Sequence, residues 1–399
     1  MSTPLEALGY PLAFEVADRP GLDAPPVRLD QAQRTRVRAL SGMQKEALVT
    51  DTASGTTWRL VSDEGEYLDG DDIAPAPLAC LTTGMVSSFA TELRTLADRH
   101  GVDLGELTLR QDNYSTMNGS ALRGTMTAGA LPVELDVAFD GDADEDVVAD
   151  LAETAVRTSP INGLLTEVQG SQFTLSVDGR EVDTGDASGL DGDPVADPAD
   201  VFESLPRDAA EQDRPIIHRT GRETEPLPEA DQRYTSGSGS SLEEEQDRVL
   251  YLRGVCTVDD DGVKTVAVKL FSPIGTIFEF RSDEPASHGG GGRAPPAMTY
   301  VAAGLGFCFM TQIGRYADIT DKALDDYRIV QDTHFSFGTR ERGDEPGEAA
   351  PVETHVFLDT DEDDDAAREI LSMSEQTCFL HALCAADLDP PTVAVSRSG

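Results

Sequence analysis

Alternating apolar and polar residues mark a series of strands in the second half of the chain. The runs at 263–271 and 275–280 are rich in valine, threonine and phenylalanine, and a short turn separates them. Because side chains alternate across a strand, this pattern is typical of strands with one buried face. Two further runs, at 326–337 and 352–358, predict additional strands.

Two longer patterns predict helices. The apolar run from Met298 to Gly314 is too long for a strand, and prolines precede it, where a missing N–H removes no helical bond. The acidic stretch 359–365 then begins a second predicted helix that continues to about Ala386. Its carboxylates lie at the N-terminal end, where the helix dipole stabilises negative charge. Because the strands are segregated from the helices, the pattern predicts an α+β fold.

The sequence also repeats itself at a separation of 220 residues. Ser62–Glu64 corresponds to Ser282–Glu284, and Gly84 corresponds to Gly304, with no gap between these landmarks. Self-similarity of this kind indicates an internal duplication.

The repeat predicts three parts of the chain. Residues 1–184 form the first copy, residues 247–399 the second, and 185–246 an acidic linker rich in glycine, serine and proline. Within the linker, residues 214–219 are more apolar and are expected either to dock onto a domain or to stay part of the flexible segment.

Charge narrows the possible partners. The chain has 74 acidic and 31 basic residues, and its formal net charge is −43, which excludes nucleic acid and anionic membranes as partners. The carboxylates are spread through segments with periodic apolar residues, so we interpret them as a folded acidic surface adapted to high salt. In molar salt the Debye length falls to about 3 Å, which screens their mutual repulsion. A specific acidic interaction surface is the alternative. Lysine is rare and occurs only at Lys45, Lys264, Lys269 and Lys322.

The N-terminal residues, the length of the apolar stretches and the cysteines indicate in which compartment the protein is found. Residues 1–19 lack a basic region followed by an apolar run, and we expect no apolar stretch approaching the roughly 18 residues of a membrane span. The five cysteines are sparse and odd in number, unlike a secreted disulfide framework. We therefore expect a soluble cytoplasmic protein. The cysteines are Cys80, Cys256, Cys308, Cys378 and Cys384.

Two of these cysteines lie on the predicted helices. Cys308 is on the first helix and Cys378 on the second, although a cysteine on an apolar helix is usually an inert core residue. His381 falls on the same face as Cys378 and is either a packing or capping residue or a general base. Cys378, His381 and Cys384 are clustered, but a structural zinc site needs four ligands, so we expect neither a metal nor a cofactor.

The order of these features resembles the OsmC/Ohr family. A Ser-Asp-Glu-Pro strand end at 282–285 is followed by a glycine-rich loop at 289–292, a proline-initiated helix with Cys308, and Cys378 about 70 residues later. The resemblance implies an α+β fold, intertwined dimers and two cysteines close together near the dimer interface. The duplicated chain would then be an intramolecular pseudo-dimer of two tandem OsmC-like units, with strands packed around buried central helices. Further oligomerisation is left open.

The resemblance also implies roles for the cysteines. Cys308 would attack a hydroperoxide and become a sulfenic acid, and Cys378 would resolve it as a disulfide before over-oxidation. An external dithiol would restore both thiols. The first copy has Ser88 and Ser159 at the matching positions, the second after a one-residue slip in register. Since a hydroxyl cannot perform this chemistry, we expect that copy to be a scaffold.

One feature of the family is missing at its usual spacing. Family peroxidases place a glutamate ten residues before the reactive cysteine, paired with an arginine from the preceding loop. Met298 occupies that position here, and Leu78 does so in the first copy. Arg293 in the loop is the candidate for this arginine. Arg281 on the preceding strand is also available, but it is alternatively an ordinary surface residue of that strand.

Two functions remain open on this basis. The first is a thiol-dependent hydroperoxidase that uses Cys308, Cys378 and Arg293, with a hydroperoxide as substrate and an external dithiol as reductant. The alternative is a non-catalytic pseudo-dimer that binds a small apolar molecule or senses oxidation.

Overall fold

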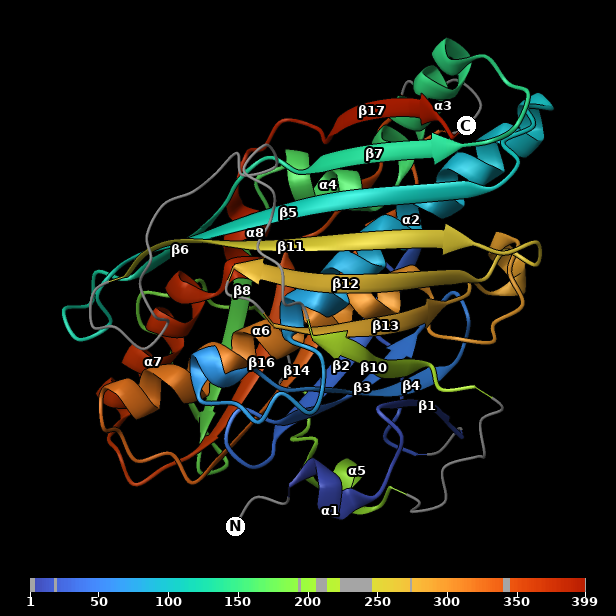
Figure 1. The fold of residues 1–399 in the computed structure, drawn as a ribbon. Helices are drawn as coiled ribbons and strands as arrows, with labels where there is room; N and C mark the ends of the chain where they lie inside the picture. The colour runs from blue at the N-terminus through green and yellow to red at the C-terminus, as the bar shows by residue number, and fades with distance from the viewer. Residues whose placement is uncertain are drawn as a thin grey trace.

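A computed structural model describes residues 4–17, 20–192, 195–205, 214–222, 246–272, 275–339 and 345–398. It has a mixed α+β fold with two sheets, each built from both halves of the chain (Figure 1). The first sheet has the order β1 (Ala13–Val16), β4 (Thr57–Ser62), β3 (Lys45–Asp51), β2 (Gln31–Ala39), β14 (Asp326–Ser336), β16 (Val352–Asp359), β8 (Ser171–Val177) and β9 (Arg180–Val182), with β15 (Glu348–Ala349) paired to β14.

The second sheet follows the same plan with the halves exchanged. Its order is β10 (Ile217–Arg222), β13 (Thr276–Ser282), β12 (Lys264–Ser272), β11 (Gln246–Val258), β5 (Leu107–Gly119), β7 (Glu134–Phe139) and β17 (Thr392–Arg397), with β6 (Thr127–Ala130) paired to β5. In each sheet one strand pairs in parallel with a strand of the other half, β8 with β16 and β17 with β7. The halves are therefore interleaved.

Matching ion pairs join the halves within each sheet. Where β2 pairs with β14, the Arg34 guanidinium binds both carboxylate oxygens of Asp332 at 2.8 and 2.7 Å. Where β11 pairs with β5, Arg253 binds Asp112 in the same bidentate way at 2.7 and 2.8 Å. This planar two-point geometry fixes the strand register more firmly than a single bond would.

Two long helices fill the space between the sheets. Helix α2 (Pro77–His100) packs on β5, β11 and β12, whereas α6 (Ala297–Ile319) packs on β2, β3 and β14. The two helices also pack against each other, and in Figure 1 they lie behind the sheet of β5, β11 and β12. Helix α6 is long and apolar enough by composition to cross a membrane, contrary to our expectation, but 94% of its most apolar window is buried inside the protein.

Shorter helices pack against the two long ones. Helices α3 (Glu145–Thr158) and α4 (Ile161–Thr166) follow β7, and α7 (Asp364–Thr377) and α8 (Phe379–Ala385) follow β16. Helix α3 packs against α2, and α7 and α8 pack against α6. Short turns complete the list: α1 (Leu5–Leu8), α5 (Ala199–Glu203), η1 (Glu66–Leu68) and η3 (Ala286–His288). The single helix expected from 359 to about 386 was wrong, because Cys378 leaves helical dihedrals with φ −78° and ψ 116° and so divides α7 from α8.

Parts of the expected linker lie in the described structure. Strand β10 pairs with β13, and Ile216 and Ile217 are buried there, as docking of this segment requires. Helix α5 buries Phe202 beneath the Arg38 guanidinium, 4.8 Å from the ring centre. The rest of the expected linker, residues 193–194, 206–213 and 223–245, lies outside the described residues.

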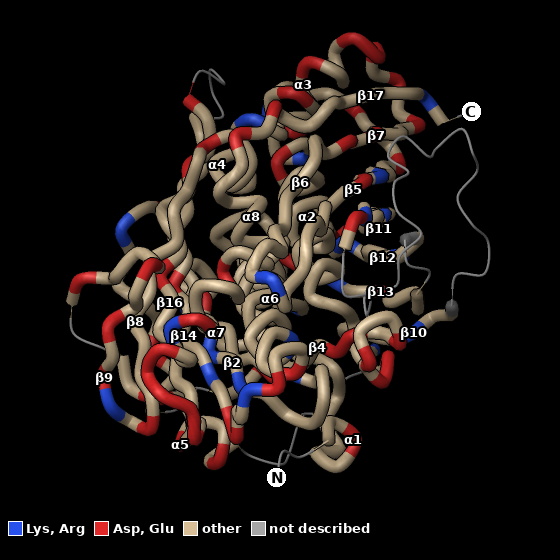
Figure 2. The backbone as a smooth tube through the Cα atoms, turned by 90° about the vertical axis from the view of Figure 1, so that its left-hand side faces the viewer, with Lys and Arg blue, Asp and Glu red and all other residues tan. Residues whose placement is uncertain are grey.

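Acidic residues lie around the periphery rather than in one block. Figure 2 shows Asp and Glu along α3, around α5 and near β8 and β9, with Lys and Arg more scattered. Carboxylates spread in this way repel one another over the whole surface when salt is low.

Two glycines allow the central helices to approach closely. A Cβ on Gly84 would lie 2.6 Å from the Ala297 carbonyl oxygen and 2.8 Å from the Val301 nitrogen. A Cβ on Gly304 would lie 2.9 Å from the Leu81 nitrogen. Because these neighbours are backbone atoms, a side chain at either glycine would push the helices apart.

We expect Gly84→Ala to lower the free energy of unfolding by about 1–3 kcal/mol, the usual effect of overpacking a tight core. Chemical denaturation measures this change. Thr95→Ala, a half-buried site on the same helix, is the control and should stay within about 0.5 kcal/mol of the wild type. Equal stabilities of the two variants would show that the helices have room to separate.

Candidate thiol site

The structure brings Cys308 and Cys378 together. Cys308 lies on α6, Cys378 lies at the α7–α8 junction, and the two buried thiols are close enough for Cys378 to raise the pKa of Cys308. The backbone N–H of Leu380, near the start of α8, acts in the opposite direction and lowers the pKa of Cys308. The break after α7 produces this arrangement, because it turns the first N–H groups of α8 toward α6 instead of continuing the α7 axis.

Burial dominates the protonation of Cys308. Its pKa is raised well above the usual thiol value, first by desolvation and then by the hydrogen bond and charge of Cys378, with a smaller contribution from Glu64. The Leu380 N–H opposes this shift, because it favours the thiolate. Cys308 is therefore a protonated thiol in the resting protein.

A carboxyl group from the other half of the chain reaches this site. Glu64, just after β4, accepts hydrogen bonds from Tyr67 Oη at 2.8 Å and from Thr311 Oγ1 at 3.2 Å. Thr311 lies one turn beyond Cys308 on α6. Burial raises the pKa of Glu64, and the charge of Lys45 opposes this shift.

Lys45 supplies positive charge on the same side. It begins β3, is fully buried, and donates from Nζ to the Met43 carbonyl oxygen at 2.5 Å. Burial lowers its pKa to about 8, while Glu64, Asp63 and Cys308 raise it. Arg315, two turns beyond Cys308, also interacts with Glu64, and burial lowers its pKa to about 10. Cationic groups thus lie on the Glu64 side of the thiol.

The expected role of Arg293 is not supported by its position. Its guanidinium binds Asp283 at 2.9 Å and Asp261 at 3.1 Å, and its side chain is 42% exposed. The physical reason is the path of the chain. The loop between β13 and α6 lies against α2, on the serine side, whereas the loop after β4 lies against α6.

The first half carries the same arrangement with oxygen in place of sulfur. Ser88 Oγ and Ser159 Oγ lie 2.8 Å apart. Lys264 Nζ donates to Thr91 Oγ1 at 2.8 Å and lies 3.3 Å from Glu284, so these residues stand where Lys45, Thr311 and Glu64 stand at the thiols. A small cavity here is lined by Gln31, Asp51, Ser88, Thr91, Glu92, Glu284, His288 and Met298 among others. Met298 therefore lies at the serine site and not at Cys308.

Glu64 and Lys45 were missed from the sequence, although both left a signal. Glu64 belongs to the Ser-Asp-Glu repeat. Lys45 pairs across the strands with Ser62, and Lys264 pairs with Ser282 in the other sheet. In a chain with four lysines, two in equivalent places indicate a selected position. Spacing along one copy could not show this, because the carboxyl group and its thiol belong to opposite halves.

The remaining cysteines are core residues. Burial raises the pKa of Cys80, Cys256 and Cys384 to about 12 in each case, and all five cysteines are free thiols. Within the described ranges, no group of three or more His, Cys, Asp or Glu side chains is placed to hold a metal ion, including the cluster around His381.

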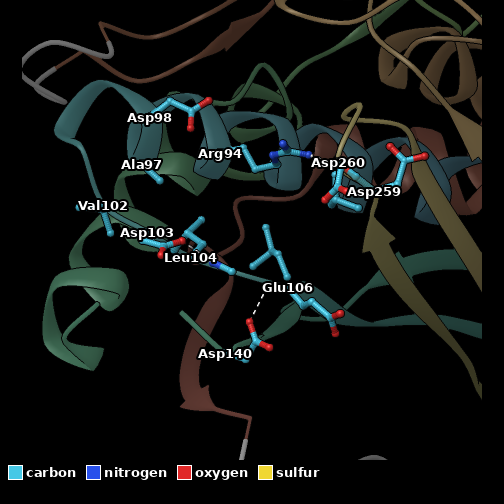
Figure 3. Close-up of a pocket in the computed structure, with 13 residues that line it drawn as sticks. Arg94, Ala97, Asp98, Val102, Asp103, Leu104, Glu106, Asp140, Asp259 and Asp260 are labelled. Atoms are coloured by element: carbon cyan, nitrogen blue, oxygen red, sulfur yellow. Dashed lines mark hydrogen bonds between the residues drawn. The ribbon is translucent and has the colours of Figure 1, made fainter. Parts of the chain in front are cut away.

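An open pocket of about 470 Å³ lies elsewhere, at the far end of α2 (Figure 3). Its polar lining is mostly acidic, and one of its carboxylates, Asp140, accepts a hydrogen bond from the Glu106 N–H at 2.6 Å. The lining comprises Arg94, Ala97, Asp98, Val102, Asp103, Leu104, Gly105, Glu106, Leu107, Asp140, Val258, Asp259 and Asp260. It includes no cysteine, so this pocket is separate from the thiol site.

The buried charges should tune Cys308 in opposite directions. Lys45→Met removes a positive charge and should slow alkylation of Cys308 at pH 8 several-fold, because it raises the thiol pKa. Glu64→Gln removes a negative charge and should accelerate alkylation. Mass spectrometry resolves Cys308 from the other cysteines. Lys264→Met, the equivalent change at the serine site, is the control, and identical rates in all three variants would contradict the assignment.

Comparison with known proteins assigns one segment of the chain to a family. Residues 289–389, about a quarter of the chain, match the family model described as OsmC-like protein. No curated protein matches the chain. Among solved structures, the chain is similar to an OsmC-like hydroperoxide resistance protein from Jannaschia sp. CCS1, with 22% identity covering 32% of this chain and 79% of that one, and a TM-score of 0.20, too low for an argument from shape. The family match is therefore confined to residues 289–389, which carry Cys308 and Cys378 and are similar to OsmC-like proteins.

Proposed function

We propose that the protein reduces organic or inorganic hydroperoxides through Cys308, with Cys378 as the resolving thiol. The observation that carries this proposal is the closeness of the two buried thiols, which is enough for Cys378 to act on the pKa of Cys308. The OsmC-like family match over the same residues supports a redox or hydroperoxide-related role.

The reaction uses two thiols in sequence. The Cys308 thiolate attacks the distal oxygen of a hydroperoxide, the O–O bond breaks, and an alcohol leaves after taking up a proton, so that Cys308 becomes a sulfenic acid. The Cys378 sulfur then attacks the Cys308 sulfur and water leaves, which forms the disulfide. An external dithiol reduces that disulfide by exchange.

Two groups would help Cys308 to ionise despite its burial. Lys45 and the Leu380 N–H favour the thiolate over the thiol. Glu64 opposes ionisation of Cys308, but its carboxylate accepts a hydrogen bond from the Thr311 hydroxyl. We propose that this carboxyl group fixes the α6 face on which the hydroperoxide binds.

We further propose that the chain is a tandem duplication acting as a pseudo-dimer whose first thiol pair has been lost. The equal strand orders of the two sheets support this, as do the paired positions Arg34 and Arg253, Gly84 and Gly304, and the serine pair that mirrors the thiols. In this view the first half contributes Glu64 and Lys45 to the one redox site.

The alternative of an apolar ligand has less support. An apolar cavity between α2, β5 and α8 is lined by residues that include Leu78, Leu81, Leu131, Leu380 and Leu383. Its volume of about 20 Å³ is enough for about one water molecule and too small for an organic ligand.

Mass mapping after one equivalent of hydroperoxide tests the redox proposal. We expect a Cys308–Cys378 disulfide in the wild type and a trapped sulfenic acid on Cys308 in Cys378→Ser. The double variant Ser88→Ala/Ser159→Ala is the matched control and should consume hydroperoxide as fast as the wild type, because it loses no thiol. The proposal fails if Cys308 stays reduced while Cys80, Cys256 or Cys384 is oxidised.

We also propose a cytoplasmic location and adaptation of the acidic surface to high salt, on the basis of the five free thiols and the net charge of −43. Screening of carboxylate repulsion should raise the thermal unfolding midpoint between 0.2 M and 3 M KCl. Calorimetry at matched pH measures this. A midpoint that is independent of salt would favour a specific acidic interaction surface instead.

A further inference from the structure

A buried histidine contacts the sulfur of the resolving thiol. His381 lies on the first turn of α8, is 2% exposed, and has its Nδ1 atom 3.1 Å from Cys378 Sγ. Its Nε2 atom is buried, and no hydrogen-bond partner for it lies among the described residues. Its polar contact is therefore directed to the thiol rather than to a structural carbonyl.

The surroundings of His381 keep its ring neutral. The ring packs at 4.8 Å from the Phe309 ring of α6 and at 6.1 Å from the Phe173 ring of β8, centre to centre. Burial lowers its pKa to about 4, and the carboxyl group of Glu375 on α7 opposes this shift. The other titratable groups near it are the thiols of Cys378, of Cys384 three residues later on α8 and, beyond them, of Cys308. At neutral pH the imidazole can therefore accept a proton.

The serine half offers a natural comparison. With the one-residue slip that aligns Ser159 with Cys378, the position of His381 is taken by Asn162. The Asn162 amide donates to Thr166 Oγ1 at 3.1 Å and to the Gly347 carbonyl oxygen at 3.3 Å. The half that lacks the thiols thus has an amide, which cannot take up a proton, and that amide binds structural partners.

We propose that His381 is the general base of the disulfide-forming step, an inference that rests on the proposed function. Nδ1 removes the proton of the Cys378 thiol as its sulfur attacks the Cys308 sulfenic acid. The S–O bond breaks, and its electron pair leaves with the oxygen. The proton held on the imidazole passes to that leaving hydroxide, so the products are one disulfide, one water molecule and a neutral histidine.

The two chemical steps can be measured separately in single-turnover experiments. Formation of the sulfenic acid is followed by trapping with a dimedone-type reagent in the Cys378→Ser background. Formation of the disulfide is followed by acid quench and alkylation with Cys378 intact. The variants are His381→Asn, which introduces the residue of the serine half, and His381→Phe, which keeps the aromatic volume between Phe309 and Phe173. Asn162→Ala is the matched control.

We expect both histidine variants to form the sulfenic acid within about twofold of the wild-type rate and to form the disulfide at least tenfold more slowly. The pH profile separates a base from a packing residue. With a base that is neutral above about pH 4, the wild-type disulfide step should be flat from pH 6 to 8. In the variants it should rise about tenfold per pH unit, since hydroxide must then ionise the thiol.

Two results would overturn this inference. One is a disulfide step in both variants that is as fast as in the wild type. The other is a slower step with the flat wild-type pH profile, which would assign His381 a packing role. A Cys308 thiol that forms no sulfenic acid in any variant would instead overturn the proposed function, and this inference with it.

Discussion

The close contact between α2 and α6 is the constraint on which the rest of the structure depends. Gly84 and Gly304 leave no Cβ in the contact, so the backbone of each helix lies against the other. Each helix rests on a different sheet, and each sheet contains strands from both halves. The halves therefore cannot separate without exposing both helices and breaking the central strand pairs. This interleaving places side chains that are distant in sequence around one thiol.

The same interleaving explains how far the sequence could predict the site. The resemblance to the OsmC/Ohr family implied that Cys308 lies near Cys378, and both residues belong to one half of the chain. Glu64 was not predicted, because the family spacing pointed to position 298, which is in the second half and holds a methionine. Arg293 was chosen by spacing in that half as well, and its guanidinium binds Asp283 and Asp261. Spacing within one half cannot reveal a contact that crosses between the halves.

The fold itself was more accessible to sequence reasoning than the site. Period-two runs located β12 and β13, because those strands bury one face, and two further runs located β14 and β16, whose residues are mostly buried on both faces. The proline-initiated apolar run located α6. The break at Cys378 was missed, because residues 364–385 contain no proline or glycine to mark it. Thr377 and Ser374 do carry a weaker sign. Their hydroxyls bond to the carbonyl oxygens four residues earlier, a contact that tends to bend helices.

Sulfur and oxygen place different demands on the same buried frame. A serine pair can be buried inertly, because the two hydroxyls satisfy each other at 2.8 Å and Ser159 also receives the Ile161 N–H at 3.2 Å. A thiol pair is equally easy to bury while protonated, but burial then opposes the thiolate on which its chemistry depends.

Charge and proton acceptors must therefore come from nearby groups, and both are present on the sulfur side, as Lys45 and as the neutral His381 ring. On the oxygen side the lysine is retained, as Lys264, whereas an amide replaces the imidazole. A buried lysine is thus common to both halves, whereas the histidine occurs only in the half that has the thiol pair.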